Sequence, residues 1–301
     1  VKRSRSSRPR TPIQTSGGSP PRSSVASDVA ELELTPQLFA IFTSLVEHAC
    51  GLHYDAHDRE LFGTKLAAYA AELGYDSLLD FYYRLRYDDP DGSELQRLVE
   101  ALVVHETYFF RELDPLRTLA ESHLARVIAE RGRARVWSAA CATGEEPLTL
   151  AMLLAERGLL DRVEILGTDL SAAAIARAKQ GRHSRRALRL DPPPDLVERY
   201  LDRVATGVTV TPRIHRAVEF RTLNLLDDAA VAALGTFDVI LCRNVLIYFS
   251  DELVVRIVDR LARALAPNGM IAVGVSESLL RFGTSLVCEE RGNSFFYRRA
   301  T

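Results

Sequence analysis

Residues 28–102 show apolar positions at helical spacing. Thr35-Pro36 is typical of a helix start, because threonine caps a helix and proline fits its first turn. Leu38, Phe42 and Leu45 then fall on one face. Further helices are expected from about Asp58, Ser77 and Ser93, with breaks at Gly74 and at residues 90–92. The pattern therefore predicts a small helical domain over residues 28–102.

From residue 115 onward, short apolar runs alternate with helical segments. Strands are expected at residues 135–139, 163–168, 219–223, 237–242 and 270–275. Helices are expected at residues 115–131, 145–156, 171–180 and 251–266. Such alternation predicts an α/β fold with a parallel sheet that is covered by helices on both faces. The Pro-Asn-Gly sequence at residues 267–269 is expected to form the turn into the last parallel strand.

Two features complete the predicted architecture. Residues 286–290 and 294–298 flank an Arg-Gly-Asn sequence, which indicates an antiparallel hairpin. Residues 181–218 interrupt the alternation and are interpreted as a small β-containing insert. A doubly wound sheet ending in such a hairpin resembles the architecture expected of class I methyltransferases. The predicted organisation is a tail (1–27), a helical domain (28–102), a linker that contributes to the site (103–114) and an α/β domain (115–301).

Composition and charge narrow the class of protein. Residues 1–27 carry six basic residues and no acid, and they have almost no large apolar side chain, so we expect a disordered basic tail. The rest holds 32 basic residues against 40 acidic ones, which argues against a nucleic-acid partner. The four cysteines form no C-x-x-C pair, and neither a membrane span nor a signal peptide is evident. We expect a cytoplasmic protein with reduced thiols.

Candidate chemistry lies where the predicted strands end, because ligands of open α/β sheets bind at that edge. After the first strand, small residues lead to Gly144 and a helix, which allows close approach of a ligand or simply makes a tight turn. Asp169 ends the second strand and suits a ribose diol, although it could equally cap the helix in competition with Ser171.

The later strands end in polar residues as well. Asn224 could meet an adenine amino group or serve as a turn residue. Arg243 and Asn244 directly follow an apolar strand, and a buried charge there requires a ligand or an acid as partner. The upstream segment 104–112 is either domain packing or a lid that brings Arg111 into the site. The histidines at 48, 53 and 57 fit no standard metal spacing, and no metal site is expected.

Together these residues resemble a known family, the CheR-type chemotaxis receptor methyltransferases. The resemblance runs from about residue 30 to the C-terminus, with the motifs in the family's order. It rests on four segments, namely TYFFRE at 107–112, WSAACATGEEP at 137–147, FDVILCRNVLIYF at 237–249 and SES at 276–278.

The resemblance implies S-adenosylmethionine as cofactor, S-adenosylhomocysteine as product and a glutamate side chain of a chemoreceptor as methyl acceptor. The cofactor-binding residues it implies are Thr107, Arg111, Gly144, Glu146, Asp169, Asn224, Leu225, Arg243 and Asn244. Of these, Asp169 would bind the ribose, while Asn224 and Leu225 would flank the adenine. Arg111 and Tyr248 would lie near the sulfonium and the incoming carboxylate as the catalytic pair.

These residue types suit that chemistry. A carboxylate is already ionised at neutral pH, so methyl transfer requires no strong general base. It requires an in-line approach with the acceptor oxygen held close to the methyl carbon. A guanidinium and a phenol can orient a carboxylate, so Arg111 and Tyr248 are expected to contribute mainly positioning.

The chain departs from the family's usual pattern at several positions. His105 stands where asparagine is usual, Leu148 where tyrosine is frequent, and Val275 where histidine usually precedes Ser-Glu-Ser. Some members carry arginines on the second helix that meet the receptor, whereas residues 65–72 here contain one basic residue, Lys65. The usual receptor-docking surface is therefore altered.

The insert also differs. Residues 200–210 are short compared with members that bind a receptor's C-terminal peptide tether, so we expect no tether binding. The basic residues of the insert could meet an acidic protein, or they form a solvated flank; these are Arg182, Arg185, Arg186 and Arg189.

The expected partner is a methyl-accepting chemoreceptor or related signalling protein of a bacterium, bound by a monomer without membrane insertion. Two alternatives remain open at this point. A small-molecule methyltransferase would share the cofactor half of the chain. A non-catalytic S-adenosylmethionine-binding scaffold would share it too, although the presence of both Arg111 and Tyr248 favours an enzyme.

Overall fold

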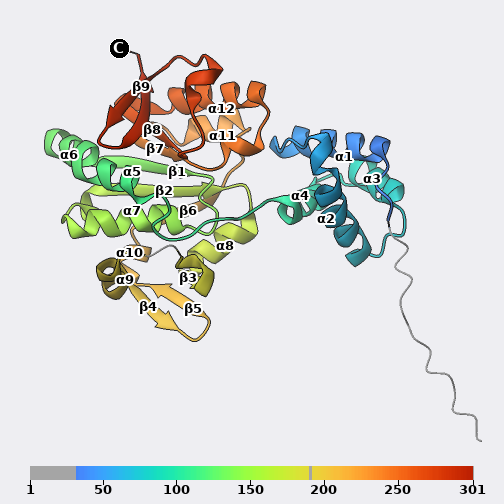
Figure 1. The fold of residues 1–301 in the computed structure, drawn as a ribbon, viewed down its shortest axis with the longest axis horizontal. Helices are drawn as coiled ribbons and strands as arrows, with labels where there is room; N and C mark the ends of the chain where they lie inside the picture. Colours follow the sequence, from blue (N-terminus) through green and yellow to red (C-terminus); the bar gives the residue numbers. More distant parts are fainter. Residues whose placement is uncertain (1–31, 190–191, 301) are drawn as a thin grey trace, which may run out of the picture. The chain divides into compact units, whose positions relative to one another are not determined.

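The computed structural model describes residues 32–189 and 192–300 (Figure 1). The basic segment 1–27 lies outside the described residues. Among those described, no helix is long and apolar enough to cross a membrane. Residues 32–301 cluster as one unit, so the boundaries expected near residues 102 and 115 stay predictions.

Four helices occupy the first part of the described chain, as expected from the sequence. They are α1 (Pro36–Cys50), α2 (Arg59–Glu72), α3 (Leu78–Tyr87) and α4 (Ser93–Leu102), with a 3-10 turn, η1 (Ala56–Asp58), before α2. Thr35 caps α1 by accepting a hydrogen bond from the Leu38 amide at 3.2 Å. Phe42, Phe62 and Phe81 are fully buried between the helices, so aromatic side chains form much of this core.

A seven-stranded sheet forms the second part, in the order β6-β2-β1-β7-β8-β10-β9 (Figure 1). The strands are β1 (Ala134–Ala139), β2 (Val163–Asp169), β6 (Val218–Thr222), β7 (Phe237–Cys242), β8 (Leu265–Val273), β9 (Leu286–Arg291) and β10 (Ser294–Arg299). The first five are parallel, and β10 pairs antiparallel with both β8 and β9. The predicted doubly wound sheet with a terminal antiparallel hairpin is confirmed.

Helices cover both faces of this sheet. The main ones are α7 (Glu145–Glu156), α8 (Ala172–Gln180), α11 (Asp228–Ala233) and α12 (Asp251–Arg263), with 3-10 turns η3 (Leu160–Arg162), η5 (Leu246–Tyr248) and η6 (Leu279–Phe282). Side chains of β1 alternate, so that Val136 packs in the core with α7 and α8, whereas Trp137 packs in the core with α11 and α12. Burial on both sides explains why the parallel strands read as continuous apolar runs.

Two expected elements differ in detail. The helix expected at 115–131 is α5 (Leu113–Thr118), a π-helical turn η2 (Leu119–Leu124) and α6 (Ala125–Arg131). The wide turn contains His123, which is fully buried and lies 3.2 Å from the carbonyl oxygen of Asp238 on β7. Continuous helical periodicity in the sequence did not reveal this long-range contact.

The turn expected at residues 267–269 is instead part of β8. The preceding helix ends at Arg263, and β8 begins at Leu265, which pairs with Phe237. Val239 pairs with Met270, so the extra residues form a bulge in which Asn268 has φ 62°. Pairing with β7 therefore extends the strand across residues that read locally as a turn.

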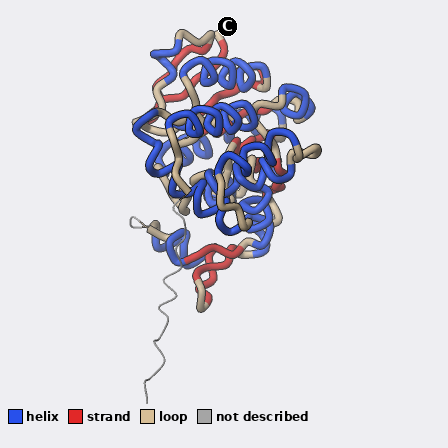
Figure 2. Tube along the Cα trace, turned by 90° about the vertical axis from the view of Figure 1, so that its right-hand side faces the viewer, coloured by secondary structure: helices blue, strands red, loops and turns tan. Residues whose placement is uncertain are grey.

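The insert contains a three-stranded antiparallel sheet of order β3-β5-β4, which Figure 2 shows in red near the bottom. Its elements are β3 (Arg182–Ser184), η4 (Arg185–Ala187), α9 (Pro194–Tyr200), β4 (Leu201–Val204), β5 (Gly207–Val210) and α10 (Pro212–His215). The expected β-containing insert is thus present. A buried hydrogen bond of 2.8 Å joins His183 of β3 to Glu145 at the start of α7.

Candidate functional site

A cavity of about 710 Å³ lies at the carboxyl edge of the parallel sheet. This volume is within the range of roughly 300–1,000 Å³ that is typical of small-molecule sites. Its wall includes nearly all the site residues expected from the sequence, namely Thr107, Arg111, Glu146, Asp169, Asn224, Leu225, Arg243, Asn244 and Tyr248. Gly144 is the exception among them.

Gly144 lies behind the cavity wall. Its φ is 92°, and a Cβ atom there would lie 2.8 Å from the ring of Phe220. The loop before it also uses left-handed backbone at Ala140 (φ 61°) and Ala142 (φ 48°). Gly144 therefore allows this loop to fold tightly between β1 and α7, and the loop residues before it face the cavity.

Asp169 ends β2 with its carboxylate held by backbone donors. Its Oδ2 accepts the Ala142 amide at 2.7 Å, and its Oδ1 accepts the Ser171 amide at 2.9 Å. Ser171 caps α8 through the Ala174 amide, which leaves further lone pairs on Asp169 for a ligand. Burial raises the pKa of Asp169, although the two backbone hydrogen bonds act in the opposite direction.

His105 lines the cavity close to Asp169. Its Nε2 atom is buried and has no hydrogen-bond partner among the described residues. Burial lowers the pKa of His105, and the negative charge of Asp169 opposes this effect. The imidazole is therefore neutral at neutral pH and forms part of the cavity wall beside Asp169.

Asn224 follows β6 and is already engaged on both sides of its amide. Its Nδ2 donates to the carbonyl of Ala49 at 3.0 Å, and its Oδ1 accepts the Leu226 amide at 2.9 Å. The side chain thus ties the end of β6 to α1, while Leu225 supplies an apolar part of the wall. An adenine ring lying here would meet the backbone and Leu225 more readily than the Asn224 amide.

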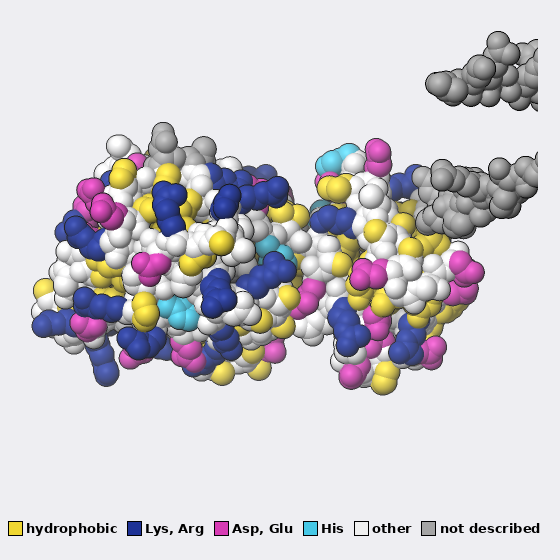
Figure 3. All heavy atoms as spheres, turned by 90° about the horizontal axis from the view of Figure 1, so that it is seen from below, with side chains coloured by type: hydrophobic (Ala, Val, Ile, Leu, Met, Phe, Trp, Pro, Cys, Tyr) yellow, Lys and Arg dark blue, Asp and Glu magenta, His cyan; other side chains and the backbone are white. Residues whose placement is uncertain are grey.

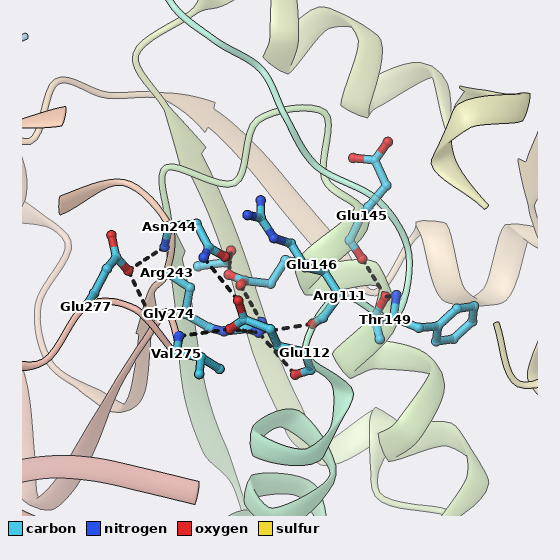
Figure 4. A network of polar contacts seen from close by, with 12 residues as sticks. Arg111, Glu112, Glu145, Glu146, Thr149, Arg243, Asn244, Gly274, Val275 and Glu277 are labelled. Atoms are coloured by element: carbon cyan, nitrogen blue, oxygen red, sulfur yellow. Dashed lines mark hydrogen bonds and ion pairs between the residues drawn. The ribbon is translucent and has the colours of Figure 1, made fainter. Parts of the chain in front are cut away.

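Arg243 has the acidic partners that its position after β7 required. Its Nη1 donates to Glu146 Oε2 at 2.8 Å and its Nη2 to Glu112 Oε2 at 3.0 Å (Figure 4). The Arg243 side chain is 1% exposed, and its Nε atom has no partner in the described part of the chain. Arg243 therefore joins two carboxylates at the base of the cavity.

Glu112 and Glu277 were not predicted as site residues. Asn244, which has φ 58°, donates its Nδ2 to Glu112 Oε1 at 3.1 Å and its backbone amide to Glu277 Oε2 at 2.5 Å. Glu277 also accepts the Gly274 amide at 2.7 Å, so it fixes the ends of both β7 and β8 (Figure 4). Each glutamate lies inside a recognised motif, but nothing in the local sequence indicated its partners.

Arg111 and Tyr248 both line the cavity, although they are far apart in the sequence: Arg111 precedes α5, and Tyr248 ends η5. Arg111 donates to the Glu106 carbonyl at 2.7 Å, and its guanidinium lies 5.6 Å from the ring centre of Tyr108. Burial raises the pKa of Tyr248 above its ordinary value, while the charge of Arg111 opposes this rise. Tyr248 therefore stays a protonated hydrogen-bond donor at neutral pH.

Among the described residues that line the cavity, one group of side chains brings together atoms that could bind a metal. Asp55, His57 and Asp58 have such atoms within 4.8 Å of one another. These side chains are largely exposed, and exposed acidic groups are common without a metal. The cluster gives no reason to assign a metal.

Comparison with known proteins identifies the family. Residues 105–290 match the family model "CheR methyltransferase, SAM binding domain". The chain is 35% identical over 250 residues to chemotaxis protein methyltransferase 1 of Pseudomonas aeruginosa, covering 80% of this chain and 90% of that protein. It is 32% identical over 257 residues to a chemotaxis protein methyltransferase of Vibrio parahaemolyticus, covering 82% and 91%.

A third relative has a different described role. The chain is 37% identical over 201 residues to the "Probable biofilm formation methyltransferase WspC" of Pseudomonas aeruginosa, covering 66% of this chain and 47% of that protein. The family model covers the chain from the segment before α5 into β9, and the match to the first Pseudomonas protein covers most of the chain. The chain therefore belongs to the CheR methyltransferase family and carries that family's S-adenosylmethionine-binding domain.

Proposed function

We propose that the protein methylates glutamate side-chain carboxylates on a chemoreceptor or a related signalling protein. The observation that carries this proposal is that Arg111 and Tyr248 line the same cavity as Asp169. Asp169 suits the ribose of the cofactor, whereas Arg111 and Tyr248 suit an anionic acceptor. One cavity thus has room and partners for both reactants.

The cavity fits S-adenosylmethionine by its donor set. Asp169 would accept from the ribose hydroxyls with the lone pairs that its backbone donors leave free. Leu225 would lie against the adenine, and Asn224 would hold that wall in place through α1. Glu146 would meet the amino-acid end of the cofactor, since Arg243 orders its carboxylate.

The remaining residues that were expected at the cofactor site would contribute to it in different ways. Thr107 and Arg111 would close over the cofactor from the segment before α5, because both line the cavity. Asn244 would contribute from the end of β7, where two glutamates fix its backbone and side chain. Gly144 would act through the shape of the loop and not by direct contact.

Bound S-adenosylmethionine supplies an activated methyl group on a positively charged sulfur. An acceptor glutamate is ionised at neutral pH, so it could take up the methyl group directly, and no residue of this chain would have to remove a proton from it. Arg111 would pair with the acceptor carboxylate, and the protonated Tyr248 would donate one hydrogen bond to it. Both side chains would place the oxygen in line with the methyl group.

We further propose that methylation here does not depend on a C-terminal peptide tether. In the insert, β4 and β5 are joined by only two residues, Ala205 and Thr206. Arg182, Arg185 and Arg186 are exposed on the same insert, and Figure 3 shows many Lys and Arg side chains on the face seen from below, interspersed with Asp and Glu. This basic surface would suit an acidic part of the partner.

The test is transfer of a labelled methyl group to membranes and soluble extract of the source bacterium. Base-labile label on a membrane protein is expected, because carboxyl methyl esters hydrolyse in base. Arg111→Ala should lower turnover by about 100-fold or more while S-adenosylhomocysteine still binds, because Arg111 would act mainly on the acceptor.

Other outcomes would contradict the proposal in distinct ways. Label found only in small molecules would indicate a small-molecule methyltransferase. Tight cofactor binding without any transfer would indicate a scaffold. Full turnover by Arg111→Ala would remove Arg111 from the mechanism.

A further inference from the structure

Glu112 joins three segments that are far apart in the sequence. Its Oε2 accepts from Arg243 Nη2 at 3.0 Å and from the Val275 amide at 3.2 Å, while its Oε1 accepts from Asn244 Nδ2 at 3.1 Å. The carbonyl of Glu112 also accepts from Arg243 at 3.1 Å. One side chain thus attaches the segment before α5 to the ends of β7 and β8 (Figure 4).

The backbone of Glu112 is in an unfavourable conformation. Its φ is 45° and its ψ 62°, which is the left-handed region that non-glycine residues rarely adopt. Phe110, two residues earlier, has φ 66°. Such conformations persist only where surrounding contacts hold them, and they are concentrated at functional sites. The hydrogen bonds of the Glu112 carboxylate, together with the one that its carbonyl accepts from Arg243, hold this conformation.

The charge of Glu112 is stabilised where it lies. Burial alone would raise its pKa, but the charge of Arg243 and the hydrogen bonds from Asn244, Arg243 and Val275 outweigh burial and lower the pKa below its ordinary value. The carboxylate is therefore ionised at neutral pH and acts only as an acceptor. Arg243, 1% exposed, lies between this carboxylate and that of Glu146.

Glu112 itself does not line the cavity, but Arg111, Arg243 and Asn244 all do. The backbone carbonyl of Arg111 accepts from Arg243 Nη2 at 3.0 Å, so the same contact fixes residues 111 and 112 together. Beyond this, the Arg111 side chain donates a hydrogen bond to the Glu106 carbonyl and lies over the ring of Tyr108. The fixed backbone at 111–112 thus determines the point from which the Arg111 guanidinium reaches the cavity.

We infer that Glu112 is a positioning residue, whose contacts with Arg243, Asn244 and the Val275 amide hold Arg111 at the methyl-acceptor site. The inference rests on the proposed function for the role of Arg111. It adds a residue that acts through Arg111 and that touches neither cofactor nor acceptor.

The first test is turnover and cofactor affinity of Glu112→Ala. Because a shift of about 1 Å in a positioning group can cost about 100-fold in rate, kcat should fall by about 10- to 100-fold. The dissociation constant of S-adenosylhomocysteine, measured by calorimetry, should change less than about threefold, because Arg243 keeps its bond to Glu146. Unchanged kcat, or a loss confined to cofactor affinity, overturns the inference.

The second test asks whether Glu112 acts through Arg111. In an Arg111→Ala background, Glu112→Ala should cost less than about a further twofold, since residues acting as one unit are not additive. A fall in kcat as large as the one that Glu112→Ala causes in the wild type would contradict the inference.

Glu112→Gln should give turnover between wild type and Glu112→Ala, because its amide oxygen can still accept from Arg243. This variant provides the test if the alanine variant fails to fold. Glu130→Gln, in an exposed pair with Arg126, is the matched control and should keep wild-type turnover.

A third measurement is independent of the acceptor's identity. The Phe109 amide donates to the Ala187 carbonyl at 2.9 Å and the Phe110 amide to Thr149 Oγ1 at 3.1 Å. Hydrogen exchange at these two amides should be about tenfold or more faster in Glu112→Ala, because the segment is released from the sheet. Unchanged exchange overturns the inference even if another acceptor is the substrate, whereas absence of methyl transfer by the wild type overturns only the proposed function.

Discussion

At the scale of single residues, several buried or half-buried polar side chains of this protein have partners that are distant in sequence. Arg243 pairs with Glu112 and Glu146, and Asn224 donates to Ala49. His123 is fully buried within the π-helical turn, where its ring lies 3.2 Å from the carbonyl oxygen of Asp238. Of these groups, the buried His123 makes stability depend on pH, because its pKa is shifted in the folded chain.

His123 provides a prediction about pH. Burial, together with the charges of Arg291 and Arg126, lowers the pKa of His123 from 6.5 to about 4, although the Asp238 carbonyl opposes the shift. The unfolded chain takes up a proton as pH falls below 6.5, whereas the folded chain does not until about 4. The contribution of the neutral His123 to the stability of the folded chain is therefore complete above pH 6.5, and it is lost as the pH falls toward 4.

The measurement is the free energy of unfolding in urea at about pH 7.5 and pH 5. Between these two pH values, the free energy of unfolding of the wild type should fall by about 2 kcal/mol more than that of His123→Gln, because glutamine does not titrate. His48→Gln changes an exposed histidine and should match the wild type. Equal losses in wild type and His123→Gln would show that His123 does not titrate in this way.

At the scale of elements, the loop between β1 and α7 depends on one glycine. Gly144 has φ 92°, and ring atoms of Phe220 lie 2.8 Å from the place that a Cβ atom would take. Gly158, at the end of α7, also has a positive φ (66°) but nothing within 4 Å of that place. The two positions therefore separate the cost of backbone conformation from the cost of a steric clash.

Gly158→Ala should lower the free energy of unfolding by about 1–2 kcal/mol, the cost of left-handed backbone in a residue with a Cβ. Gly144→Ala should cost about 1–3 kcal/mol more, because Phe220 must shift. Urea unfolding measures both values. Gly144→Ala should also weaken S-adenosylhomocysteine binding, while Gly158→Ala should not. Equal unfolding free energies for the two variants would exclude the proposed clash.

At the scale of the whole molecule, residues before α2 contact the carboxyl edge of the sheet. Leu52 forms an antiparallel bridge with Phe249, and the His53 amide donates to the Tyr248 carbonyl at 2.9 Å. These contacts, with the one from Asn224 to Ala49, bring the first helices to the cavity wall. A ligand in this cavity should therefore stabilise helices and sheet together.

The increase in the free energy of unfolding that a bound ligand causes tests this expectation, and a variant of Asp169 tests the role of that residue. At a concentration about 100 times its dissociation constant, S-adenosylhomocysteine should stabilise the wild type by about 2.7 kcal/mol. In Asp169→Asn the loss of a charged acceptor should weaken binding by about 10- to 100-fold, so the same concentration should add about 0.4–1.4 kcal/mol. Asp161→Asn, an exposed partner of Arg213, serves as control. Equal stabilisation of Asp169→Asn would remove Asp169 from the cofactor site.

The sequence alone determined the architecture and the edge of the sheet where the site lies. Period-3.6 and continuous apolar runs reflect local burial, so they predicted α7, the parallel strands and the terminal hairpin. Because parallel strands end at one edge, Asp169, Asn224 and Arg243 were expected together, and they line one cavity. Whether Asp169 or Ser171 caps α8 stayed open in the sequence, and the folded structure gives this role to Ser171.

The tertiary structure decided the partners and the irregularities. The bulge in β8 depends on pairing with β7, and the π-helical turn accompanies a contact between His123 and Asp238. The two acids on Arg243 lie 97 and 131 residues away from it, and Ala49 lies 175 residues from Asn224. Residues at such separations meet only when the chain folds, so no local pattern carries their pairing.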